Sequence, residues 1–179
     1  MILVFDWETT GLTLHPDADI RRQPRAIEFG GVLLSLETGA IEEECSALID
    51  PEEPITEEIT KITGITDADV KGAPTFVQFL PTLTRFFSAA TAIVSHNLPF
   101  DKSILRGELA RAEVTTFHWP EKEMCTVGIY APLWGKNPRL IELYESVIGH
   151  PLAQTHRALD DVKAVVEIMH KEELWRLLA

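Results

Sequence analysis

Cysteine, long hydrophobic runs and positive charge are all scarce in this sequence of 179 residues. Its two cysteines, Cys45 and Cys125, are too few for a disulfide framework and lack the spacing of a metal site, so we expect ordinary thiols in a reducing compartment. No apolar run approaches the roughly 20 residues of a membrane-spanning helix, and the N-terminus lacks the pattern of a signal peptide. We therefore expect a soluble, cytoplasmic protein with no membrane partner.

The charge balance is strongly acidic, with 28 Asp and Glu against 16 Lys and Arg and a formal net charge of −12. Because phosphate binding normally relies on Lys and Arg, this balance argues against a long nucleic-acid footprint. It does not exclude binding of a chain end, since a metal site would itself account for part of the negative charge. The densest basic group either holds a strand or, as is commoner for such clusters, forms a solvated loop; it contains Arg21, Arg22 and Arg25.

The length and the hydrophobic content of 45% fit one compact domain over residues 1–179. Apolar patterning and turn residues predict a mixed α/β organisation, in which Pro81 kinks or splits one helix. The predicted strands cover 2–5, a hairpin of 26–36 and 41–49, and 92–95. The predicted helices cover 56–63, 75–88, 100–112, 140–148 and 156–177.

The first of three acidic motifs follows directly on the first predicted strand. Asp6 and Glu8 are two residues apart, so their side chains point to the same face, while Trp7 points to the interior. Two carboxylates in one pocket are unfavourable unless a cation lies between them. Mg²⁺ and Mn²⁺ prefer oxygen ligands, so the motif indicates a divalent metal site.

Two further motifs combine a histidine with an aspartate. Asp101 falls in the first turn of a predicted helix, where the helix dipole favours a carboxylate even without metal. Asp161 falls more than one turn into the last predicted helix. Five helical residues leave a net rotation of about 140°, so His156 and Asp161 could not share a helix face, and His156 is expected in the loop before that helix. The neighbouring Asp160 is expected at the surface, and His96 is expected to be a hydrogen-bonded structural residue.

In order and spacing, the three motifs resemble the histidine branch (DEDDh) of the DEDD superfamily of 3′-to-5′ exonucleases, in particular the subgroup of the epsilon proofreading subunit of bacterial DNA polymerase III. The resemblance spans nearly the whole chain and implies a ribonuclease H-like fold, a mixed five-stranded sheet flanked by helices. It further implies a site with two Mg²⁺ or Mn²⁺ ions and release of nucleoside 5′-monophosphates. The implied general base is His156, since an imidazole is largely neutral at physiological pH. The implied metal ligands are Asp6, Glu8, Asp101 and Asp161.

The same resemblance implies contacts with the terminal nucleotide. Gly11 permits close backbone approach, so main-chain amides of Thr9, Thr10 and Gly11 could meet the substrate, although a simple turn is the alternative. Glu58 and Thr63 match positions that lie near the 3′-terminal nucleotide in these enzymes. Many members carry His where Thr63 stands, which leaves the base and sugar preference open.

Three functions follow as hypotheses. The leading one is a metal-dependent 3′-to-5′ exonuclease acting on single-stranded DNA ends, with a DNA polymerase or another replication or repair factor as a partner. The close alternative is an exoribonuclease acting on short RNA. The third is a nucleic-acid-binding or polymerase-associated module without useful catalysis, which the acidic composition allows but the complete set of motif residues disfavours.

Overall fold

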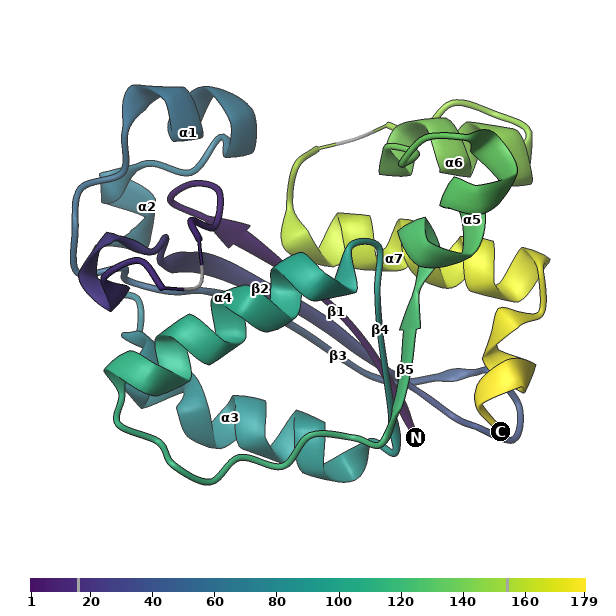
Figure 1. The fold of residues 1–179 in the computed structure, drawn as a ribbon, viewed down its shortest axis with the longest axis horizontal. Coiled ribbons are helices and arrows are strands. Elements are labelled where there is room, and N and C mark those ends of the chain that lie inside the picture. Colours follow the sequence, from purple (N-terminus) through teal and green to yellow (C-terminus); the bar gives the residue numbers. More distant parts are fainter. Residues whose placement is uncertain (16, 154) are drawn as a thin grey trace.

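The protein is described by a computed structural model over residues 1–15, 17–153 and 155–179. Its centre is a five-stranded sheet in the order β3-β2-β1-β4-β5 (Figure 1). The β2 strand runs antiparallel to β1 and β3, whereas β4 runs parallel to β1 and β5 runs parallel to β4. The strands are β1 (Ile2–Thr9), β2 (Ala26–Leu34), β3 (Ile41–Leu48), β4 (Ala92–Ser95) and β5 (Lys122–Cys125). The predicted fold, a mixed five-stranded sheet flanked by helices, is confirmed.

Helices cover both faces of the sheet, with α7 on one face and α3 and α4 on the other (Figure 1). The α-helices are α1 (Glu57–Thr63), α2 (Asp67–Val70), α3 (Phe76–Ala89), α4 (Leu98–Arg111), α5 (Thr126–Trp134), α6 (Leu140–Ile148) and α7 (Ala158–Lys171). Short 3₁₀ helices are η1 (Ile20–Arg22) and η2 (Leu174–Leu178). None of the helices in the described parts of the chain combines the length and the apolar character needed to cross a membrane.

Alternate side chains of β1 point to opposite faces of the sheet. Ile2 and Val4 pack into the core under α7, whereas Leu3 and Phe5 pack into the core under α3 and α4. Trp7 belongs to the second core and is only 3% exposed, which confirms its predicted burial. Asp6 and Glu8 therefore share the α7 face, as their spacing predicts.

Local sequence signals explain most helix boundaries. Thr56 caps α1 with its side chain, and α1 ends at Gly64 in the left-handed conformation with φ of 71°. Thr75 forms a reciprocal capping box with Gln78 at the start of α3. Contrary to the prediction of a possible split, α3 continues through Pro81 without interruption from Phe76 to Ala89.

Several boundaries differ from the predicted ones. The first strand extends through both acidic residues to Thr9, and α2, β5 and α5 have no predicted counterpart. The last predicted helix, 156–177, is two elements, because Glu173 adopts a left-handed conformation with φ of 50° between α7 and η2. Since α7 begins at Ala158, Asp161 lies in its first turn rather than deeper in the helix.

Candidate metal centre

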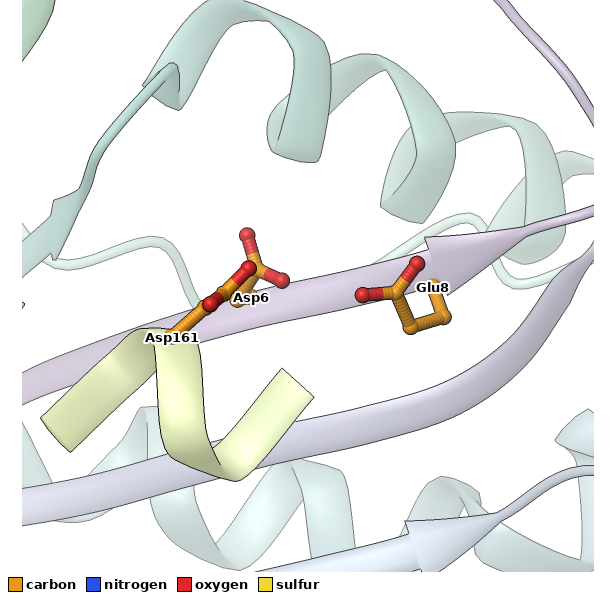
Figure 2. Close-up of side chains that lie close together, drawn as sticks. All are labelled: Asp6, Glu8 and Asp161. Atoms are coloured by element: carbon orange, nitrogen blue, oxygen red, sulfur yellow. The ribbon is translucent and has the colours of Figure 1, made fainter. Parts of the chain in front are cut away.

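Three carboxylates from two elements meet above the sheet. Asp6 and Glu8 extend from one face of β1, and Asp161 reaches them from the first turn of α7 (Figure 2). Each of the three offers an oxygen, and these oxygens all lie within 4.8 Å of one another. Residues near the two ends of the sequence thus supply one compact set of carboxylate oxygens.

Asp101 approaches the same place from the first turn of α4. It is outside the group of three, but together with Asp6 and Asp161 it lines a hollow of about 390 Å³. Its side chain is 1% exposed, and its Oδ2 accepts a hydrogen bond from the hydroxyl of Ser95. Its Oδ1 is buried and accepts no hydrogen bond of standard geometry from the described residues. A buried carboxylate oxygen in this state normally calls for an additional partner.

The pKa values of the clustered carboxylates indicate that a positive charge would be favourable between them. Burial raises the pKa of Asp6 well above its ordinary value, and the charges of Asp101 and Glu8 raise it further. Burial and the charge of Asp161 raise the pKa of Glu8 to about 8. Burial also raises the pKa of Asp101 to about 7, although the Ser95 hydrogen bond opposes the rise. The residues therefore fit a divalent cation, which would neutralise the carboxylates and take up the buried oxygen of Asp101.

His156 lies in the segment that leads into α7, outside the helix, as predicted. It is exposed and has a left-handed backbone with φ of 51°. Asp160 is exposed as predicted, and its Oδ2 accepts a hydrogen bond of 2.5 Å from the hydroxyl of Thr155. The structure thus separates the two adjacent aspartates, since Asp161 turns to the cluster and Asp160 to the surface.

The Thr9–Gly11 segment leaves β1 directly after Glu8. Thr9 is 8% exposed and its hydroxyl donates to the carbonyl of Gly11 at 2.7 Å. The Thr10 hydroxyl donates to Glu53 at 3.0 Å and accepts the backbone N–H of Arg25 at 2.9 Å. A side chain at Gly11 would meet nothing within 4 Å, so there is room beside this backbone.

Glu58 and Thr63, both on α1, differ in accessibility. Glu58 is exposed in the first turn. Thr63 is only 4% exposed, and its hydroxyl donates to the Ile59 carbonyl at 3.0 Å and accepts the Ile65 N–H at 3.1 Å. The Thr63 side chain is therefore occupied in ending α1, which leaves little of it for a ligand.

His96 and the basic residues Arg22 and Arg25 differ in their surroundings. The His96 ring is hydrogen-bonded, as predicted, to the Thr126 hydroxyl at 2.7 Å and to the Pro138 carbonyl at 3.1 Å. Arg25 does not belong to a solvated loop, because its side chain is 15% exposed and pairs with the buried Glu108. Arg22, in contrast, is exposed.

Sequence reasoning missed the polar residues that support the ligands. Ser95 binds Asp101, and Glu28 pairs with Arg157 beside the start of α7. Glu28 carried a usable signal, since a charged residue inside the apolar run 26–36 must either face solvent or find a buried partner. The partner itself is 129 positions away in the sequence, so only the fold reveals it.

Comparison with known proteins links this geometry to nucleases. A protein-family model described as "Exonuclease" matches residues 3–169. A Mycobacterium tuberculosis protein whose name describes a bifunctional exonuclease/endonuclease is 35% identical over 177 residues, which cover 94% of this chain and 26% of that protein. DNA polymerase III PolC-type from Clostridium perfringens is 32% identical over 168 residues, covering 93% of this chain and 11% of that protein. The chain thus spans about a quarter and about a tenth of the length of these two relatives.

A shorter relative and two solved structures agree with this link. DNA polymerase III subunit epsilon from Treponema pallidum is 28% identical over 165 residues, covering 92% of this chain and 72% of that protein. The nuclease domain of 3′hExo, a DEDDh family member bound to rAMP, has a TM-score of 0.75 at 20% identity, covering 97% of this chain and 90% of its own. Exonuclease X in complex with 5′-overhanging duplex DNA has a TM-score of 0.66 at 23% identity, covering 97% and 93%. At these identities the two structures establish a shared fold.

Proposed function

We propose that this chain, which belongs to the exonuclease family and is of the DEDDh type, is a metal-dependent 3′-to-5′ exonuclease. In this proposal it hydrolyses phosphodiester bonds at the 3′ ends of single-stranded DNA and releases nucleoside 5′-monophosphates. The observation that carries the proposal is the meeting of Asp6, Glu8 and Asp161, whose ligand oxygens lie within 4.8 Å of one another.

The proposed metal ligands are the four carboxylates Asp6, Glu8, Asp101 and Asp161, and the proposed cofactor is two ions of Mg²⁺ or Mn²⁺. When bound, such ions supply Lewis-acid activation of water and neutralise the charge that develops on the phosphate and the leaving oxygen. Asp6, Asp101 and Asp161 line a partly enclosed hollow, where electrostatic interactions are stronger than in bulk water. Their mutual repulsion in the metal-free protein favours loading, because loading relieves it.

His156 is proposed as the general base. Its ring takes a proton from the attacking water, and its position outside α7 leaves it accessible to that water. Asp161, three residues into the helix, is held by the regular backbone of α7 and serves as a ligand. The proposed base thus lies outside α7 and the proposed ligand lies within it, because α7 begins at Ala158.

Substrate contacts are proposed at two places. The backbone of Thr9, Thr10 and Gly11 is a candidate for binding the terminal nucleotide, supported by the open space beside Gly11. Glu58 is exposed and keeps its proposed role, whereas burial of the Thr63 side chain makes a direct contact there weaker than expected. The proposed partners are single-stranded 3′ ends and, since two relatives are DNA polymerase III proteins, a polymerase or another replication or repair factor.

Residues 1–179 are proposed to form one exonuclease domain, of which the family match covers 3–169. The cytoplasmic location stays a prediction from the sequence.

The test is a time course on matched DNA and RNA 20-mers labelled at the 5′ or the 3′ end, with Mn²⁺, Mg²⁺ or EDTA. We expect a ladder from the 5′-labelled DNA, immediate mononucleotide release from the 3′-labelled DNA, and no cleavage in EDTA. Faster cleavage of RNA than of DNA would favour the exoribonuclease alternative. Absence of cleavage with either metal would favour a binding module and overturn the proposal.

A further inference from the structure

Glu28 lies under the first residues of α7 although it belongs to the middle of the sheet. It is fully buried on β2, directly opposite Glu8 in the antiparallel pairing with β1. Like charges at such a cross-strand position are destabilising, and a buried carboxylate is costly unless it is paired. A glutamate here, opposite Glu8, therefore needs partners that offset this cost.

The contacts of Glu28 all reach the beginning of α7. The Arg157 guanidinium donates from Nε at 3.0 Å and from Nη2 at 2.6 Å to Oε1. The backbone N–H of Ala158, the first residue of α7, donates to Oε2 at 3.1 Å. Glu28 of β2 thus caps the positively polarised N-terminus of α7, since Arg157 at the N-cap position provides no side-chain cap.

Gly30, two residues along β2 and opposite Asp6, lies under the same turn. A Cβ at this position would be 2.3 Å from the carbonyl carbon of Ala158 and 2.4 Å from the nitrogen of Leu159. The backbone of α7 therefore rests directly on the backbone of β2. A side chain here would have to push the helix away from the sheet.

Arg157 and Ala158, which Glu28 holds, lie in the chain between His156 and Asp161, the proposed base and the proposed ligand. His156 immediately precedes Arg157, and its left-handed backbone with φ of 51° is a conformation that non-glycine residues rarely adopt. Asp161 follows within the first turn, with its backbone N–H bonded to the Arg157 carbonyl at 3.1 Å. Glu28 and Gly30 also belong to the strand that pairs with Asp6 and Glu8, so one strand fixes both halves of the ligand set.

We propose that Glu28, Arg157 and Gly30 form a positioning element that sets the distance between Asp161 on α7 and the carboxylates of β1 and that orients His156. This inference rests on the proposed function, because it assigns these residues to the metal centre. None of the three is proposed to touch the reacting atoms.

A matched control exists at the far end of α4. Glu108 is 1% exposed, accepts Arg25 Nε at 3.0 Å, and accepts the backbone N–H of Ala26 at 2.9 Å. Like Glu28 it is a buried carboxylate that pairs with an arginine and accepts a backbone N–H. It pairs in addition with Arg111 at 3.4 Å, and it holds the start of β2 instead of the start of α7. A general effect of losing a buried, arginine-paired carboxylate would therefore appear equally in Glu28→Gln and Glu108→Gln.

The experiment compares Glu28→Gln, Arg157→Gln, Arg157→Lys, Gly30→Ala and Glu108→Gln with the unaltered protein. We expect Glu28→Gln to weaken Mn²⁺ binding by about tenfold or more, as loss of residues that orient metal ligands commonly does. Arg157→Gln should behave similarly, Arg157→Lys should recover part of the affinity, and Glu108→Gln should change it less than about twofold at a comparable loss of thermal stability. The pH dependence of the exonuclease rate should change for Glu28→Gln and not for Glu108→Gln.

Amide hydrogen exchange in EDTA gives a readout that needs neither metal nor activity. We expect faster exchange at Ala158, whose N–H donates to Glu28, and at the hydrogen-bonded α7 amides of Asp161 and Val162 in Glu28→Gln and Gly30→Ala, with unchanged rates there in Glu108→Gln. Wild-type Mn²⁺ affinity and α7 exchange in Glu28→Gln would overturn the positioning element, as would equal effects of Glu108→Gln. A protein that shows the expected differences in exchange but does not cleave nucleic acid would instead refute the proposed function alone.

Discussion

Asp160 and Asp161 are adjacent in the sequence but lie in opposite surroundings. Asp161 raises the pKa of both Asp6 and Glu8 by its charge, whereas Asp160 is exposed. In the metal-free protein the charge of Asp161 therefore destabilises the folded state. At this side chain the proposed ligand role and stability oppose each other.

Asp161→Asn should raise the free energy of unfolding in EDTA by an amount on the order of 1 kcal/mol, because it removes one repelling charge. The same change should reduce the exonuclease rate by about two orders of magnitude or more, since a metal ligand is lost. Urea unfolding and the rate on a 5′-labelled strand measure the two effects. Asp160→Asn is the control, and a similar loss of rate in both variants would contradict the assignment of the ligand.

His156→Gln should lower the rate by about 10²- to 10⁴-fold, the range typical of a lost general base. Mn²⁺ affinity measured by calorimetry should stay unchanged, because the imidazole is not a proposed ligand. His118→Gln, at another exposed histidine, should alter neither quantity. Undiminished cleavage by His156→Gln would assign proton transfer to another group.

Part of the carboxylate cluster is predictable from residue spacing. The period-two alternation of a strand predicts that Asp6 and Glu8 share a face, and this is how they lie. The supporting contacts of Glu28 and Ser95 are not predictable in this way. They depend on which strands become neighbours, and a single sequence does not encode that pairing in a short-range pattern.

At the scale of elements, α3 contains an exposed Pro81 well inside its length. Proline in a helix interior removes a backbone hydrogen bond and crowds the preceding turn, which costs about 3 kcal/mol, while it also restricts the unfolded chain by about 1 kcal/mol. Pro81→Ala should therefore raise the free energy of unfolding by about 2 kcal/mol, with no change in exonuclease rate. Urea unfolding checks the first statement.

Pro99 provides the contrasting variant, because it lies in the first turn of α4, where no backbone donor is needed. Pro99→Ala should leave stability unchanged or lower it by a few tenths of a kcal/mol. If both substitutions changed stability in the same direction and to the same extent, helix position would not be the cause.

The elements that could be predicted are those with strong periodicity or clear boundary residues. The β2–β3 hairpin, α1 ending at Gly64, and α6 at Leu140–Ile148 all fall close to their predicted positions. The β5 strand has only four residues and contains Lys122 and Glu123, so it has no apolar alternation to detect. The α5 helix contains Gly128 and Pro132, both poor helix formers, and its formation depends on packing.

At the scale of the whole molecule, the carboxylate cluster couples stability to pH. Folding raises the pKa of Asp101 to about 7 and of Glu8 to about 8, from ordinary values of 3.8 and 4.5. Between the ordinary and the raised values the folded state holds protons that the unfolded state releases, so stability falls as pH increases. The repulsion that results from the net charge of −12 also lowers the stability of the folded state as pH increases.

We therefore expect the urea midpoint in EDTA to decrease steadily from about pH 5 to pH 8, and Mn²⁺ to raise it more at pH 8 than at pH 6. Glu8→Gln should flatten the decrease, because it removes one of the protons involved. If the slope were unaffected by Glu8→Gln, general charge repulsion would be its source. A midpoint that increases with pH would contradict the raised pKa values.

Both ends of the chain lie close together at one margin of the molecule, near the start of β1 (Figure 1). The Met1 carbonyl accepts the N–H of Thr91 at 2.9 Å, and the neighbouring Lys122 side chain donates to the Ala179 carbonyl at 2.9 Å. Ends this close favour circular permutation and insertion into a host loop. A linker that joined the two ends would therefore leave the hollow lined by Asp6, Asp101 and Asp161 uncovered.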